Sequence, residues 1–360
     1  MIKKIFLVTI LAIVLVPTPL LAQEYAMKVL LEARLGTGQG EFFLGEPIAP
    51  SFLGSRNEQL FFLDPGNKRL QKFDNTGQYV ASIKLDKLYH DAALDAKGFI
   101  CLFDVYSQEI LKMDIQGQIE TKYLIPWKTR GYLKVGANGD IVTKNTNMYG
   151  EDVWLIYEPA DLIRTRADGK IYVNWVKKSE ARCEWDYYLL EDYGGLRAVE
   201  YENKTKSGRP VKTEYDSREV AVYSADGQLL STITIDAPMG LAGAGVQFLE
   251  NHSSDNLFFW VEKKTTDWVE YKTKSGESLG SRNIGEFIYK YSPEGKLLAK
   301  INVSKDLRKL SDGELSYNCY TDLMIDESDN IYLFVLFGSY YNPADPDNRL
   351  RLIKWESIDS

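Results

Sequence analysis

The chain has 360 residues, of which 44% are hydrophobic, so it is long enough and apolar enough to bury a substantial core. Its net charge of −8 excludes general nucleic-acid binding, which depends on an excess of Lys and Arg to neutralise phosphates. The 12% aromatic content, with 23 Tyr, favours a strand-rich protein over a helix bundle.

The N-terminus reads "MIKKIFLVTILAIVLVPTPLLAQE", with Lys3 and Lys4 before an apolar run and small Ala22 at its end. This order of charge, apolar segment and small residue is typical of a secretory signal peptide. We expect residues 1–22 to be removed and the mature protein to be extracytoplasmic, either periplasmic or secreted. A retained N-terminal anchor is the alternative. No later segment is apolar and long enough to span a membrane, so the mature chain is expected to have no membrane span.

One short pattern recurs along the chain. It reads "FDNTGQYV" from Phe73, "MDIQGQIE" from Met113, "YSADGQLL" from Tyr223 and "YSPEGKLL" from Tyr291. Each copy predicts the end of one strand, a turn with Gly at a position of positive φ, and the start of the next strand. A weaker copy, "YEPADLIR" from Tyr157, has Asp161 where the others have Gly, and another, "WESIDS", runs into the C-terminus.

A second pattern precedes each copy: a polar turn and then a short strand that is apolar on both faces. Its copies are "NEQLFFLD", "AKGFICLFD", "NGDIVTK", "DGKIYVNWV", "SDNLFFWV" and "SDNIYLFVLF". Such strands need cover on both sides, so the repeated units are expected to stack on one another. Cys101 lies in one of these strands and is expected to be a small core residue, since the three Cys fit neither a disulfide framework nor a zinc site.

Stacked antiparallel units predict an all-β fold, a six-bladed β-propeller that forms a single domain over residues 23–360. We expect Met27 to Leu35 to pair with the last blade and close the ring, which removes exposed sheet edges. Gly169 follows Asp161 by only eight positions, so either the third blade lacks its outer strand or the blade count is one too high. Insertions are expected at about 177–217, 263–285 and 338–348, all on the same face of the ring.

The stretches "GTGQGEFFLGEPIAP", "LFFLDPGNKRLQKFDNTG" and "TDLMIDESDNIYLFV" carry a resemblance to a known family. They are similar to the NHL-repeat type of six-bladed propeller, which has a Gly-rich start, a strand ending in Asp, and a Phe-Asp-x-x-Gly hairpin. The resemblance covers Gly36 to Gly117 well and the rest loosely. It implies a propeller but no particular activity, because such propellers include enzymes, sensors and scaffolds.

The starts of the innermost strands point toward the central channel of such a ring. Alignment on the Asp/Gly turns places His90 and Asp91 opposite Thr321 and Asp322, with Tyr132 in the third blade. Two carboxylates and an imidazole at a channel mouth could hold a cation such as calcium, or a polar ligand. Alternatively, Asp91 and Asp322 accept hydrogen bonds from neighbouring backbone and only hold the ring together.

Two functions remain open from the sequence. The first is an exported binding module, expected to be monomeric, whose loop-rich face and channel take a protein, peptide or glycan. The second is a metal-dependent hydrolase or lyase with a cation at the channel mouth. No catalytic residue or cofactor is assigned. The chain has two His, so the three-His zinc site of the amidating lyases related to NHL propellers is excluded.

Overall fold

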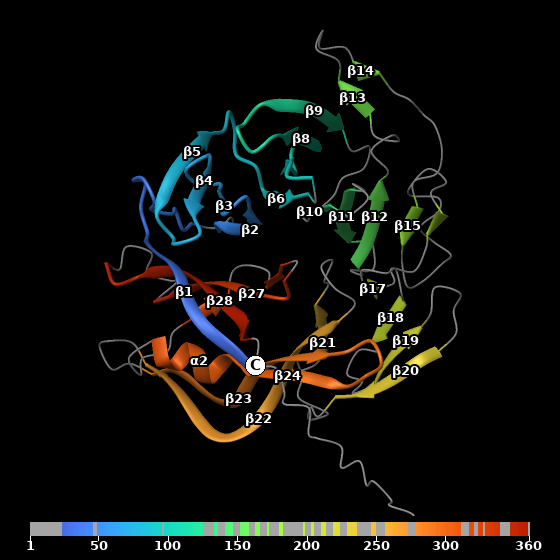
Figure 1. Cartoon of the computed structure of the whole chain (residues 1–360). Helices are drawn as coiled ribbons and strands as arrows, with labels where there is room; N and C mark the ends of the chain where they lie inside the picture. The colour runs from blue at the N-terminus through green and yellow to red at the C-terminus, as the bar shows by residue number, and fades with distance from the viewer. Residues whose placement is uncertain are drawn as a thin grey trace, which may run out of the picture.

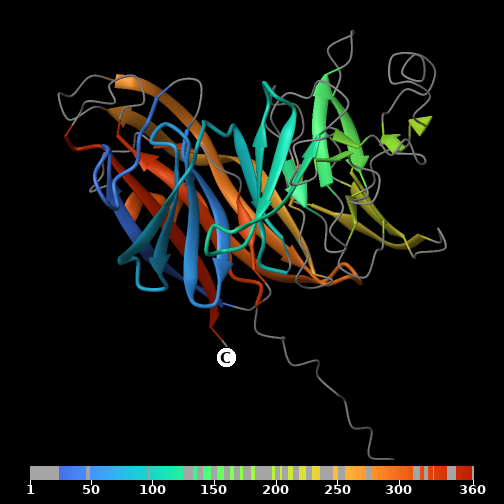
Figure 2. The ribbon, with the colours of Figure 1, turned by 90° about the horizontal axis from the view of Figure 1, so that it is seen from above.

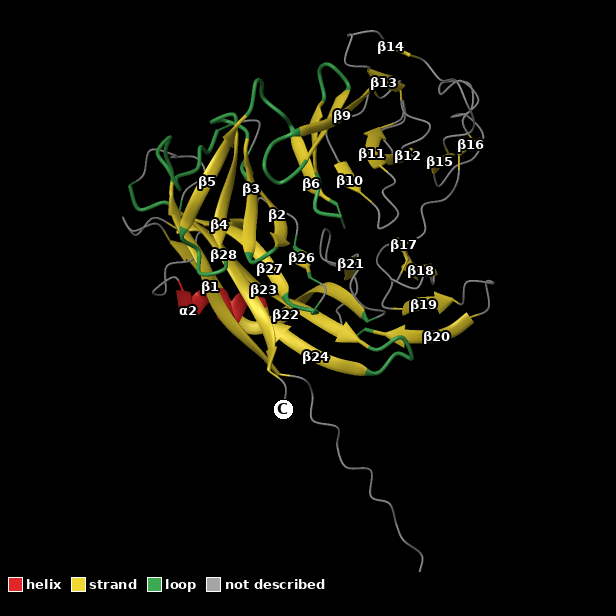
Figure 3. Ribbon diagram, turned by 45° about the horizontal axis from the view of Figure 1, so that its top comes forward, coloured by secondary structure: helices red, strands yellow, loops and turns green. Residues whose placement is uncertain are grey.

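The computed structural model describes residues 24–45, 49–95, 97–124, 133–135, 141–146, 152–157, 163–165, 171–172, 180–182, 197–198, 203–204, 210–213, 219–223, 229–235, 246–249, 256–272, 278–310, 317–319, 323–326, 328–338 and 346–358. Nearly all of the elements in these ranges are strands (Figure 3). The one helix there, α2 (Val303–Leu310), packs on β23 (Ser278–Tyr291). No helix of the described part is long and apolar enough to cross a membrane.

The strands belong to six sheets, numbered here in chain order. The first sheet contains β2 (Ser51–Arg56), β3 (Gln59–Asp64), β4 (Arg69–Asp74) and β5 (Tyr79–Lys84). The second contains β6 (Asp91–Leu94), β7 (Ile100–Asp104), β8 (Glu109–Met113), β9 (Ile119–Leu124), β13 (Ile163–Thr165) and β14 (Ile171–Tyr172). The third contains β10 (Leu133–Val135), β11 (Ile141–Thr146), β12 (Asp152–Tyr157), β15 (Glu180–Arg182) and β16 (Arg197–Ala198).

The remaining sheets complete the chain. The fourth contains β17 (Asn203–Lys204), β18 (Pro210–Thr213), β19 (Glu219–Tyr223) and β20 (Leu229–Thr234). The fifth contains β21 (Val246–Leu249), β22 (Leu257–Lys272), β23 and β24 (Leu297–Asn302). The sixth contains β25 (Tyr317–Cys319), β26 (Met324–Ile325), β27 (Ile331–Phe337), β28 (Arg349–Ile358) and β1 (Glu24–Arg34).

The sheets follow one another around a common centre in chain order, which is a propeller-like arrangement (Figure 1). The N-terminal strand β1 lies against the C-terminal strand β28 and pairs with it antiparallel, from Glu24↔Ile358 to Arg34↔Arg349. The predicted partner of the N-terminal strand is therefore the observed one. The sixth sheet consequently contains strands from both ends of the chain.

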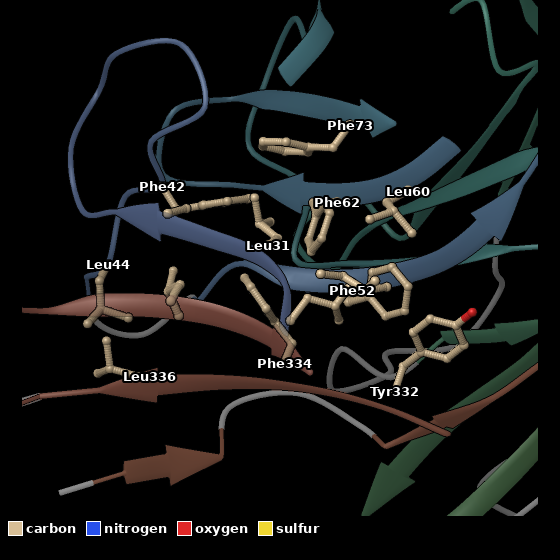
Figure 4. Packing of buried hydrophobic residues seen from close by; sticks show 14 residues of the cluster. Leu31, Phe42, Leu44, Phe52, Leu60, Phe62, Phe73, Tyr332, Phe334 and Leu336 are labelled. Carbon is tan, nitrogen blue, oxygen red and sulfur yellow. The ribbon is translucent and has the colours of Figure 1, made fainter. Parts of the chain in front are cut away.

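Buried side chains join neighbouring sheets. Between the sixth and first sheets, Phe334 lies near Phe42 and Phe62, with ring centroids 5.6 and 5.1 Å away (Figure 4). Similar clusters join the first sheet to the second, the fourth to the fifth and the fifth to the sixth. Strands β3, β7 and β27 are buried along nearly their whole length, because each faces a neighbouring sheet on both sides. Cys101 in β7 is buried, as predicted.

The recurring Gly turns pack against the preceding sheet. Gly77 has φ +83° and a Cβ placed there would lie 1.8 Å from the carbonyl oxygen of Leu30 in β1. Gly117 (φ +92°) approaches Ile83 in β5, and Gly295 (φ +86°) approaches Ile233 in β20. Glycine is thus required at these turns for two reasons: the backbone is left-handed there, and the neighbouring sheet lies too close for a side chain.

The third and fourth repeat units differ from the prediction. Strand β13, which follows the "YEPAD" copy, pairs with β9 at the edge of the second sheet, and β14 pairs with β13. The prediction that "DGKIYVNWV" provides a turn and the second strand of a further blade is therefore wrong for Ile171 and Tyr172. A Gly turn folds the next strand back onto its own sheet, and this copy has no Gly; β13 instead extends the ladder of β9. In the third sheet β15 pairs with β12, and β16 pairs parallel with β15 at the edge.

The predicted insertions contain strands. The segment 263–285 continues β22 and β23 as a long hairpin, which pairs from Lys263↔Gly285 to Lys272↔Ser278 with register shifts. Figure 2 shows these strands in orange, crossing the height of the molecule. Strands β15 to β18 lie within 177–217, and most of 338–348 lies outside the described residues.

We expect Gly77→Ala to lower the free energy of unfolding by about 2–5 kcal/mol, because the substitution adds both left-handed strain and overlap with Leu30. Gly98→Ala is the matched control. Gly98 has φ +88° but its Cβ would meet only ordinary contacts with Arg56, so about 1–2 kcal/mol is expected. Urea unfolding of both variants measures the difference. If both variants lose the same free energy of unfolding, the close contact between Gly77 and β1 contributes nothing to stability.

Candidate functional site

Two of the five residues predicted for the channel mouth can be located. His90 and Asp91 lie where β6 begins, at the inner position of the second sheet. Tyr132, Thr321 and Asp322 lie outside the described residues, so the predicted grouping with them stays a prediction. Within the described ranges, no three His, Cys, Asp or Glu side chains gather closely enough to hold a metal ion.

Asp91 connects the second sheet to the third. Its Oδ2 accepts a hydrogen bond of 2.7 Å from the backbone N–H of Leu133 in β10, and its Oδ1 accepts one of 2.7 Å from the N–H of Ala92. A backbone N–H at the start of a short inner strand needs such an acceptor when it is shielded from water. This geometry is that of the alternative interpretation, in which the carboxylate holds neighbouring sheets together.

His90 is held in a largely buried position by the turn that joins β7 to β8. Its Nδ1 accepts a hydrogen bond of 3.3 Å from the N–H of Val105 and lies 3.8 Å from Oδ1 of Asp104. The imidazole edge meets the Tyr106 ring at a centroid distance of 4.7 Å. Its Nε2 is buried and has no hydrogen-bond partner among the described residues. Burial lowers the pKa of His90, more than the Asp104 carboxylate raises it, so the imidazole is neutral at neutral pH.

Asp104 organises this end of the second sheet. It receives hydrogen bonds from the N–H of Tyr106 (2.9 Å) and from Oγ of Ser107 (2.6 Å), and Lys87 Nζ lies 2.7 Å from it. Burial by itself would raise the pKa of Asp104, but the hydrogen bonds from Lys87, Ser107 and the turn backbone lower it to about 2. The carboxylate is therefore charged across the physiological range, and the turn around it is fixed.

Asp64 has the same place in the first sheet. It accepts hydrogen bonds from the N–H of Phe43 (3.1 Å), from Asn67 Nδ2 (2.9 Å) and from Arg69 Nε (2.9 Å). In both sheets a carboxylate at the end of the second strand thus holds the turn that follows it, together with the segment leading to the inner strand. The site prediction did not include Asp64 and Asp104. The strand ending in Asp, part of the NHL-like pattern, was the signal that could have found them.

No family model matches the chain, and a search of curated proteins finds no match. Several solved structures are similar over most of their length. A member of the DUF4221 family from Bacteroides vulgatus has 9% identity and a TM-score of 0.47, and the match covers 94% of this chain and 99% of that one. A catalytically inactive virginiamycin B lyase from Staphylococcus aureus has 14% identity and a TM-score of 0.40, with 93% and 100% covered.

The WD40 β-propeller domain of Doa1 has 9% identity and a TM-score of 0.38, and the match covers 92% of this chain and 97% of that domain. Likenesses at this level carry no argument about function. The propeller-like arrangement of the described residues follows from the chain order of their six sheets.

We expect Asp91→Ala to cost about 1–3 kcal/mol of stability, because the N–H of Leu133 loses its acceptor. Asp91→Asn retains a carbonyl oxygen and should recover part of this loss. Thermal melts with and without added calcium measure the effect. If Asp91 bound a cation instead, the alanine variant would keep its melting temperature and the calcium-dependent gain of the unaltered protein would disappear.

The stability of the protein should fall as the pH drops below about 6.5, the ordinary pKa of His. The folded state holds His90 at a lowered pKa, so the unfolded chain binds the proton first and gains stability relative to the folded one. In His90→Gln this loss should shrink, as measured by melting temperature between pH 7.5 and pH 5. A separate loss of stability should remain in both proteins as the pH falls from about 4 to about 2, because the unfolded chain protonates Asp104 before the folded state does. If the melting temperatures of the unaltered protein and of His90→Gln change equally between pH 7.5 and pH 5, His90 is not the group responsible for the loss of stability.

Proposed function

We propose that this protein is an exported, NHL-like, six-bladed β-propeller, closed by β1, and that it acts as a binding module through its loop-rich face and central channel. The observation that supports the proposal best is the uneven length of the links between second and third strands. Those of the first and second sheets are tight turns after Asp64 and Asp104, whereas that of the fifth is the long β22–β23 hairpin. Long extensions on one face of a rigid scaffold are typical of binding surfaces.

Contacts on that face support the placement of the site there. The N–H of Phe43, before the first inner strand, bonds to the end of β3, and the N–H of His90 bonds to the carbonyl of Phe103 in β7. The segments that lead to the inner strands therefore lie at the same end of the sheets as the links between second and third strands. The proposed channel mouth and the β22–β23 hairpin consequently share one face.

Binding is favoured over the metal-dependent alternative by the geometry of Asp91. Each of its carboxylate oxygens accepts a backbone hydrogen bond, from Leu133 and from Ala92. A carboxylate engaged in this way is a poorer ligand for calcium than one whose oxygens are free to turn toward the ion. Export is supported by the N-terminal pattern, with β1 beginning just after the expected cleavage site near Gln23.

Shortening the β22–β23 hairpin tests the proposed function. Residues 264–283 are replaced by a tight Gly-containing turn, which keeps the paired base of the two strands. Binding to a random peptide library and to a panel of uncharged oligosaccharides is measured for both proteins. We expect saturable binding of at least one probe and a loss of tenfold or more on shortening. If neither the peptides nor the oligosaccharides bind, and the protein hydrolyses ester or lactone substrates in a calcium-dependent reaction, the proposal of a binding module is contradicted.

A further inference from the structure

We propose that the turns at the ends of β3 and β7 form one surface, presented by Phe43 and Tyr106, that binds an uncharged oligosaccharide. The inference deepens the proposed binding function and rests on it, because it names the ligand class and the residues that would contact it.

Tyr106 is exposed and yet held in place. The residue is 84% exposed, while its backbone N–H donates to Asp104 and its ring forms a T-shaped contact with His90 at an interplanar angle of 80°. The neighbouring Gln108 completes the turn with φ +55° and donates from Nε2 to the carbonyl of Val105. An exposed ring on a fixed turn loses little conformational entropy on binding, which is typical of residues that contribute strongly to affinity.

Phe43 takes the corresponding position in the first sheet, although it comes from a different segment. Gly66 is the repeat equivalent of Tyr106, and a Cβ on Gly66 would lie 2.1 Å from Cδ1 of Phe43. The Phe43 ring therefore lies over the glycine of the turn, and the residue is 41% exposed. Its N–H donates to Asp64, so the backbone that carries this ring is fixed as well. Two neighbouring sheets thus present an aromatic ring at the same place.

Most of the charges that surround these rings are paired. Lys87 lies 2.7 Å from Asp104 and 3.1 Å from Glu109, and Lys122 lies 3.4 Å from Glu109. In the first sheet Arg69 pairs with Asp64 at 2.9 Å. These three positive side chains therefore have carboxylate partners, and the exposed Lys68 of the first turn is a fourth positive side chain outside these pairs. The three pairs offer hydrogen-bonding atoms and carry no excess of either charge.

An uncharged oligosaccharide matches this combination. The C–H groups on one face of a pyranose ring are attracted to the electron-rich face of an aromatic ring, and its hydroxyl groups both donate and accept hydrogen bonds. Two aromatic rings, each carried on a fixed backbone and lying on neighbouring sheets, suit a ligand with repeated units. A charged polymer would gain little net attraction from a surface on which most charges are paired, and it would lose part of its hydration.

Isothermal titration calorimetry with cellohexaose, xylohexaose, maltohexaose and mannohexaose tests the inference on the full mature chain. We expect one or more of them to bind, and Tyr106→Ala and Phe43→Ala each to weaken that binding about tenfold. Tyr106→Phe should retain most of the affinity, because the ring is preserved. Ile119→Ala and Leu297→Ala are the matched controls. Both residues are exposed and apolar but lie at the starts of β9 and β24, after the Gly turns, so the affinity should stay within about twofold.

Three results would overturn the inference. They are the absence of binding to all four hexasaccharides, binding that Tyr106→Ala and Phe43→Ala leave unchanged, and a peptide whose binding these two substitutions abolish. Binding that the hairpin-shortened protein loses but the two alanine variants retain would leave the proposed binding function intact and refute this surface alone.

Discussion

The structure depends on burial of both faces of each sheet by its neighbours. Strands β3, β7 and β27 are buried on both sides, and a single sheet of this kind would expose two apolar surfaces to water. The contacts between sheets follow from this need. They include the ring cluster around Phe62 and Phe334, and the bond from Asp91 to Leu133. A change that separates two sheets therefore affects both of them.

The same requirement explains where glycine and buried charge occur. Gly77 lets one turn approach the backbone of β1 closely, so the first and sixth sheets can touch without a gap. Between the fifth and sixth sheets, buried Lys290 pairs with Asp329 at 2.8 Å, and Asn256 donates to the same carboxylate. Buried charges of this kind are tolerated because each has a partner and hydrogen bonds.

The candidate binding face is built on this frame. The carboxylates of Asp64 and Asp104 hold the turns on which the exposed rings lie, and neither carboxylate is itself available to a ligand. The buried polar groups thus make the turns rigid, and the exposed aromatic rings provide the area that a ligand would contact. Such a division lets the turn residues vary in sequence, as Gly66 and Tyr106 do, while the backbone around them stays alike.

The sequence alone determined the strand-rich class, the tight Gly turns and the partner of the N-terminal strand, because these follow from local patterns: alternation of polar turns with apolar runs, and glycine where φ is positive. It also singled out His90 and Asp91 from their repeat position. Tertiary structure alone decided that β13 joins the edge of β9, since pairing with a distant edge leaves no local signal. Tertiary structure also determined the hydrogen bond between Asp91 and Leu133 and the position of the Phe43 ring over Gly66. In both cases the two segments are more than twenty residues apart and meet only when the sheets stack.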